Sequence, residues 1–228
     1  CANASARNAA DILATLGALV ANGPKSGGLR GRVSGAPVDG PLGKVPAKIM
    51  LAETGYSTLA DAAGVYEFRN LPAGSYRLLV ARPGNEIYSG AVTVAGAVTT
   101  ADVGLTPARV KGNLLRNPTL TLRWASNGHL DMWYKNRKLG WRSESVPVTP
   151  GTRYRLEVER KAPGARVTVC WSTHEREGTQ TAEPALAQAE TRHEAVAPAG
   201  VKYAFIAVEG TGLPDETLSY AALARMDD

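Results

Sequence analysis

Apolar residues recur at every second position in short runs between Leu29 and about Pro107, and this alternation most constrains the fold of the chain. The run at Leu29, Gly31 and Val33 is typical, with arginines at the positions between. Successive side chains of a β-strand point to opposite faces, so such a run buries one face of a strand. Turn-forming residues, such as those at 72–74, separate six or seven of these runs. The spacing predicts a β-sandwich of about 80 residues.

The middle of this segment carries a specific motif, which runs Asp61-Ala-Ala-Gly-Val-Tyr-Glu-Phe-Arg-Asn-Leu-Pro-Ala-Gly-Ser-Tyr-Arg-Leu78. Together with Gly31-Arg-Val33, Thr58 and Asp102-Val-Gly-Leu105, it resembles the carboxypeptidase regulatory-like domain, a transthyretin-like sandwich. The resemblance implies a fold and a role as spacer or packing partner in secreted and cell-surface proteins. The residues themselves predict a turn in which the Asp61 side chain bonds to the backbone and Gly64 takes a positive φ. A ligand role for Asp61 is the alternative.

Alternation resumes after a short linker at 108–112 and continues to the C-terminus. Roughly eight strands in about 115 residues fit a jelly roll, and an immunoglobulin-like strand order stays open. The opening Asn113-Leu-Leu-Arg-Asn-Pro-Thr-Leu120, three tryptophans and the run at 146–156 resemble jelly-roll carbohydrate-binding modules and galactose-binding-like domains. The resemblance implies a sugar-binding sandwich. We therefore expect an all-β chain of two sandwich domains in tandem, at 29–110 and 111–228, held as a semi-rigid pair by the short linker.

Residues 1–28 form the third expected region, a short helix followed by a linker. Apolar residues recur at helical spacing within 5–22, and Gly23-Pro24 supplies a stop. The apolar stripe needs a partner, which is either an upstream domain or the first sandwich. Cys1 resembles the lipid-bearing first residue of a mature bacterial lipoprotein, and an arbitrary cut from a longer polypeptide is the alternative. No run of about 18 apolar residues occurs, so we expect membrane contact only through a lipid on Cys1.

Charge argues against a nucleic-acid partner. The formal net charge is +5, but residues 1–111 carry 11 Lys and Arg against 7 Asp and Glu, and residues 112–228 carry 15 against 14. The positive excess is thus spread along the chain, whereas a nucleic-acid site needs a clustered basic surface.

A cluster of aromatic and planar polar residues is the candidate binding site. Sugars present apolar C–H faces and rings of hydroxyl groups, so they bind aromatic side chains next to groups that donate and accept hydrogen bonds. The candidate ligand-binding residues are Trp133, Tyr134, Trp141, Asn127, His129, Asp131 and Arg142. Residues 126–139 and 174–190 are expected to form long loops, the first of which exposes Trp133 and Tyr134. Trp124 is expected in the core. Core packing of Trp141 is an alternative to its role in the site.

Other reactive residues give no enzymatic site. His129 and Asp131 lack a third ligand at a spacing diagnostic of a metal, and no nucleophile, phosphate-loop or zinc-protease motif occurs. Glu157 alternates with arginines on a strand, which predicts an ion-paired surface. Cys170 lies in an alternating strand, which predicts a buried and inert thiol. We expect no catalytic residue, cofactor or metal.

Two functions follow from these observations. In the first, the chain is a non-catalytic accessory protein outside the cytoplasm, secreted, periplasmic or on the cell surface, whose second sandwich binds a polysaccharide or other glycan beside an upstream catalytic domain. In the second, both sandwiches are structural modules of a larger secreted glycoside hydrolase or a surface lipoprotein, and bind no ligand.

Overall fold

The computed structural model describes residues 26–35, 45–52, 54–123, 129–136, 140–175, 180–210 and 212–226. These residues are almost entirely β-structure in four sheets, as the alternation predicts, and the helix among them is the four-residue α2 (Pro214–Thr217). No helix in these ranges is long and apolar enough to cross a membrane. The predicted helix within 5–22, Cys1, Trp124 and Asn127 lie outside the described residues.

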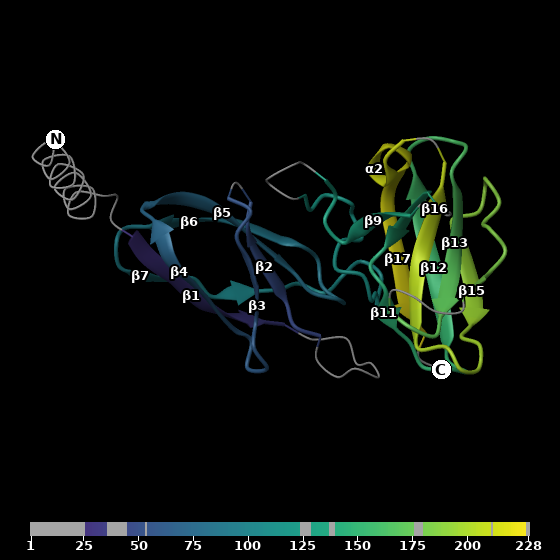
Figure 1. Ribbon diagram of the computed structural model, residues 1–228, viewed down its shortest axis with the longest axis horizontal. Helices are drawn as coiled ribbons and strands as arrows, with labels where there is room; N and C mark the ends of the chain where they lie inside the picture. Colours follow the sequence, from purple (N-terminus) through teal and green to yellow (C-terminus); the bar gives the residue numbers. More distant parts are fainter. Residues whose placement is uncertain are drawn as a thin grey trace, which may run out of the picture.

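Two sheets in the N-terminal part of the described chain enclose one hydrophobic core, and we call them the first sheet pair (Figure 1). One sheet has the order β4 (Val65–Pro72), β1 (Ser26–Ser34) and β7 (Val98–Thr100), and β8 (Val103–Gly104) also pairs with β1. The other has the order β3 (Ser57–Leu59), β2 (Lys48–Leu51), β5 (Gly74–Ala81) and β6 (Tyr88–Val94). Strand β1 runs antiparallel to β4 but parallel to β7 and β8.

The motif residues of the first sheet pair take the places that their chemistry predicts. Along β4, Tyr66 and Phe68 point into the core with their rings 6.3 Å apart in an edge-on arrangement. In the turn before β4, Asp61 Oδ1 accepts hydrogen bonds from the backbone N–H groups of Ala63 and Val65, each at 2.8 Å. Gly64 has a φ of 79°, and a Cβ there would lie 2.5 Å from the carbonyl oxygen of Val33. The predicted structural roles of Asp61 and Gly64 are therefore confirmed.

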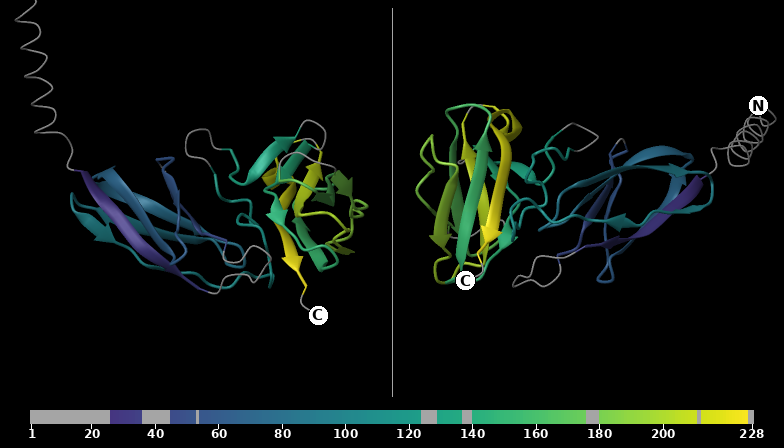
Figure 2. Two further views of the ribbon diagram at one scale, coloured as in Figure 1. Left: turned by 60° about the horizontal axis from the view of Figure 1, so that its bottom comes forward. Right: turned by 180° about the vertical axis from the view of Figure 1, so that it is seen from behind.

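Two further sheets lie in the C-terminal part of the described chain (Figure 2), and we call them the second sheet pair. They pack around a hydrophobic core of their own. Its six-stranded sheet has the order β14 (Gln180–Ala182), β13 (Arg166–Ser172), β16 (Tyr203–Glu209), β10 (Gly140–Ser143) and β9 (Trp133–Asn136), and β11 (Val146–Pro147) also pairs with β16. Its three-stranded sheet has the order β15 (Arg192–Val196), β12 (Arg153–Arg160) and β17 (Leu218–Arg225). The predicted ion-paired surface is present on β12, where Arg155 Nε lies 2.9 Å from Glu157 Oε1.

Two segments that the sequence predicts as loops contain strands. Residues 126–139 include β9, and residues 174–190 include β14. Both are short edge strands of the six-stranded sheet, and edge strands carry polar residues that resemble a loop in the sequence. Strand β1 also begins earlier than expected, at Ser26 within the predicted linker.

The segment at 107–113, which we call the connecting segment, is bonded to both sheet pairs. On the side of the first pair, Ala108 N–H donates to the carbonyl of Gly84 at 2.9 Å. On the side of the second, Arg109 pairs with Glu159 at 2.9 Å and lies 3.8 Å from the ring centroid of Tyr220. Val110 is buried against β17. These contacts restrict the movement of the two sheet pairs relative to one another.

Candidate functional site

Strands β9 and β10 place the candidate aromatic residues on opposite faces of the six-stranded sheet. Tyr134 lies directly opposite Arg142 in the antiparallel pairing, and Trp133 lies opposite Ser143. Residues directly opposite one another share a face, and neighbours along a strand point to opposite faces. Trp133 and Trp141 pack against the core of the second sheet pair, so Tyr134 and Arg142 belong to its outer face.

The prediction that Trp133 is an exposed binding platform is wrong. Its side chain is 3% exposed, and its indole N–H donates to the backbone carbonyl of Asn117 at 3.3 Å. The physical reason is the strand: because β9 alternates, Trp133 and Tyr134 cannot both face solvent on one side. Trp141 is partly buried and packs on the same core, as the alternative for this residue predicts.

Tyr134 is the exposed aromatic residue of the predicted set, with 47% of its surface accessible. Partial burial of the phenol, followed by the nearby charges of Glu144 and Asp131, raises its pKa above the usual value. The phenol is therefore protonated at neutral pH and can donate a hydrogen bond. The guanidinium of Arg142, opposite Tyr134, lies 4.9 Å from the ring centroid of the buried Phe205.

A polar groove of about 540 Å³ runs beside these two residues. It is lined by Arg116, Tyr134, Lys135, Asn136, Arg142, Glu144, Ser145 and Glu175. Ser145 Oγ donates to the carbonyl of Glu175 at 2.6 Å, which fixes the segment after β13 against the segment after β10. We call this feature the Tyr134 groove.

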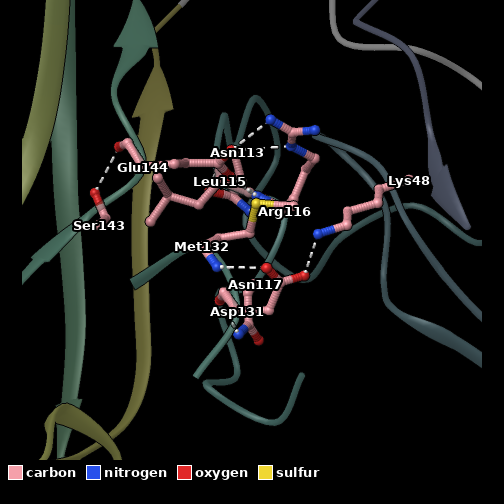
Figure 3. A network of polar contacts seen from close by, with 9 residues as sticks. All are labelled: Lys48, Asn113, Leu115, Arg116, Asn117, Asp131, Met132, Ser143 and Glu144. Atoms are coloured by element: carbon pink, nitrogen blue, oxygen red, sulfur yellow. Dashed lines mark hydrogen bonds and ion pairs between the residues drawn. The ribbon is translucent and has the colours of Figure 1, made fainter. Parts of the chain in front are cut away.

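Arg116 and Glu144 form an ion pair with several hydrogen bonds in this groove (Figure 3). The Glu144 carboxylate accepts the backbone N–H of Arg116 at 2.7 Å and its Nε–H at 2.9 Å, and Arg116 Nη2 lies 2.7 Å from Glu144 Oε2. Glu144 is 6% exposed, and its N–H donates to the carbonyl of Met132 at 2.7 Å. Such a multiply bonded pair is rigid and positions both side chains.

Asp131 does not line the groove, although the sequence placed it in the candidate site. Its carboxylate lies 2.7 Å from Lys48 Nζ of β2, so it joins the second sheet pair to the first (Figure 3). The backbone carbonyl of Asp131 accepts a hydrogen bond from Asn117 Nδ2 at 2.8 Å, which fixes the turn before β9. His129 is exposed and does not line the groove, and Asn127 lies outside the described residues. Within the described ranges, no three His, Cys, Asp or Glu residues are placed to hold a metal ion.

Of the six predicted residues that the structure describes, two, Tyr134 and Arg142, line one groove. The groove also contains residues that the sequence did not predict. A period-two assignment through 133–136 would have placed Trp133 and Tyr134 on opposite faces of a strand. No sequence signal points to Arg116 and Glu144, because they lie 28 positions apart and meet only through the fold.

Residues 28–106 match the family model of the carboxypeptidase regulatory-like domain. The match spans the strands β1 to β8 and confirms the resemblance for this segment, which is less than half of the chain. No curated protein matches the chain.

Several solved structures show distant similarity. A DUF3823 family protein from Bacteroides ovatus is 13% identical, with 89% of this chain and 100% of that chain covered and a TM-score of 0.26. A candidate carbohydrate-binding protein from Bacteroides uniformis is 10% identical, with 90% and 100% covered and a TM-score of 0.26. Carbohydrate-binding modules of the β-sandwich superfamily are 12% identical, with 79% and 84% covered and a TM-score of 0.21. Similarity at this level carries no argument about the fold or function of this chain.

Proposed function

We propose that this chain is a non-catalytic accessory protein of two tandem β-sandwich domains, and that the second domain binds carbohydrate in the Tyr134 groove. The proposed domains are a transthyretin-like sandwich at 29–110 and a jelly roll at 111–228. The observation that carries the proposal is the half-exposed Tyr134 ring beside an ordered set of charged and amide groups in a groove of about 540 Å³.

The chemistry of the groove suits a sugar. An aromatic ring packs against the apolar C–H face of a pyranose, while guanidinium, carboxylate and amide groups exchange hydrogen bonds with its hydroxyls. Tyr134 supplies the ring, and Arg142 and Asn136 supply planar polar groups beside it. The Arg116–Glu144 pair holds its shape without a ligand, so little conformational entropy is lost when a sugar binds.

Two observations support the non-catalytic part of the proposal. The matched family at 28–106 is a regulatory-like domain, and the sequence holds no nucleophile or metal-protease motif. Within the groove, both oxygens of Glu144 are engaged by Arg116 and are not free to serve an incoming substrate. The proposed location is outside the cytoplasm, with a lipid on Cys1 or an upstream catalytic domain as the means of attachment.

A purely structural role is the second candidate, and the contacts between the sheet pairs favour it. The Lys48–Asp131 ion pair and the bonded connecting segment give a spacer of fixed geometry. A spacer needs that rigidity, but it needs no exposed Tyr134 in a groove.

Binding of the full chain to a panel of soluble neutral and acidic polysaccharides, measured by isothermal titration calorimetry, tests the proposal. Tyr134→Ala is expected to weaken binding about tenfold or more with little change in the melting temperature, because a stacked aromatic ring carries much of such an interaction. Tyr56→Ala is the matched control, since Tyr56 is 51% exposed and lies on the first sheet pair. Absence of binding to every member of the panel would leave the structural role as the function.

A further inference from the structure

Arg142 differs from Arg116, which also lines the Tyr134 groove, because no carboxylate of the described residues holds it. Arg116 is neutralised by Glu144. In the part of the chain that the structure describes, the guanidinium of Arg142 makes no ion pair or hydrogen bond, and its contact is with the Phe205 ring. A guanidinium in a groove with unused N–H groups is a receptor for a planar anion.

The sheet holds Arg142 in place for this role. Arg142 lies on β10 between Tyr134 of β9 and Ala207 of β16, and Phe205 beneath it is fully buried. Contact with an aromatic ring occupies one face of a guanidinium and leaves its edge, which carries the N–H donors, open. Since two β-strands and a buried ring position the group, a ligand need not order it.

The remaining charges of the groove also favour an anion. Among the residues that the structure describes, three cationic side chains and two anionic ones line it. Once Arg116 and Glu144 are counted as a neutral pair, the charged groups that remain among the described lining residues are Arg142, Lys135 and Glu175. Glu175 repels anions, so within the groove a ligand carboxylate is most favourably placed at Arg142.

We infer that the Tyr134 groove prefers sugars that carry a carboxylate, as in uronic acid polymers, over the corresponding neutral sugars. The carboxylate accepts two N–H bonds from Arg142, and the adjoining pyranose ring packs on Tyr134. This inference rests on the proposed carbohydrate binding and names its substrate class.

The test compares ligands that differ in one charge. Polygalacturonate and alginate are titrated into the full chain beside their methyl-esterified forms, which keep the sugar rings and remove the carboxylate charge. The free acids are expected to bind roughly tenfold or more tightly than the esters, and their affinity should fall as salt is raised.

Arg142→Gln should remove most of this preference, and Arg142→Lys should restore only part of it because an ammonium group lacks the two-pronged geometry. Arg30→Gln, at an exposed position of β1, is the control and should bind like wild type. Equal affinity for acids and esters, or equal loss of both in Arg142→Gln, would overturn the inference while carbohydrate binding stands. Failure of every acidic and neutral polysaccharide to bind would overturn both.

Discussion

Lys48 Nζ lies 2.7 Å from Asp131 Oδ2, and this ion pair joins β2 of the first sheet pair to the turn before β9 of the second. The Asp131 side chain is 2% exposed and that of Lys48 is 12% exposed. An ion pair shielded from water in this way depends on its cation, because the Asp131 carboxylate alone would remain buried without an ionic partner.

Removing the cation is therefore expected to destabilise the protein. Lys48→Met should lower the free energy of unfolding by about 3 kcal/mol, since the Asp131 carboxylate would stay buried and unpaired. Urea unfolding measures this, with Arg69→Met in the exposed Arg69–Glu67 pair as the control that should leave the midpoint unchanged. The double variant Lys48→Met/Asp131→Leu should recover part of the loss. A Lys48→Met single variant as stable as wild type would contradict the structural role of the pair.

Trp133 is expected to stabilise the fold rather than bind a ligand. Trp133→Ala should cost about 3 to 5 kcal/mol of unfolding free energy, because it empties a large core site and removes the hydrogen bond to Asn117. Tyr134→Ala, one position along the strand, should have a small effect. Chemical denaturation of both variants gives the comparison, and similar losses in the two would show that the assignment of faces on β9 is incorrect.

Tyr66 is expected to make the first sheet pair sensitive to alkaline pH. Burial, with smaller effects from Asp102 and Tyr88, raises the pKa of the phenol from 10.0 to about 12, and the phenol donates to the carbonyl of Ala101 at 2.6 Å. Between these pH values the unfolded chain loses the proton and the folded chain keeps it, so the free energy of unfolding falls as pH rises. Tyr66→Phe should be less stable at neutral pH and show a weaker decline from pH 10 to 12. Parallel pH-dependent denaturation curves for the two proteins would refute this assignment.

Cys170 is expected to be unreactive in the folded protein. The thiol is 2% exposed, and its pKa is raised to about 11 chiefly by burial, with Glu209 adding to the shift and Arg142 opposing it. Since the thiolate is the reactive form, labelling by a disulfide reagent at pH 8 should proceed only as fast as the protein opens. In a Cys1→Ser variant the labelling signal comes from Cys170 alone. Unfolding in urea should expose this thiol and allow it to react. Rapid labelling without denaturant would be the contrary result.

The sequence was most informative where a local pattern sets the structure. The chemistry of aspartate and glycine predicted the turn at Asp61 and Gly64, and alternation of apolar residues predicted the strands of the first sheet pair. These features depend on neighbouring residues, so a single chain carries their signal. The burial of Cys170 followed in the same way.

The candidate site was predicted less well, because it depends on pairings between distant segments. Lys48 and Asp131 are 83 positions apart, and nothing near either residue indicates that they meet. The error at Trp133 has a different cause: Lys135 and Asn136 are polar residues of a short edge strand, so the segment resembles a loop. Once β9 is known, the face of each aromatic residue follows.

The parallel pairing of β1 with β7 and β8 bears on how the first sheet pair responds to mechanical tension. Tension applied between Ser26 and Gly104 would pull β1 and β8 in opposite directions along their length, since Val33 pairs with Val103 and Ser34 with Gly104 in the same orientation. The hydrogen bonds between them would then be loaded together in shear, instead of opening one after another like a zipper. A module anchored at one end and attached to a load at the other would resist extension through this strand pairing.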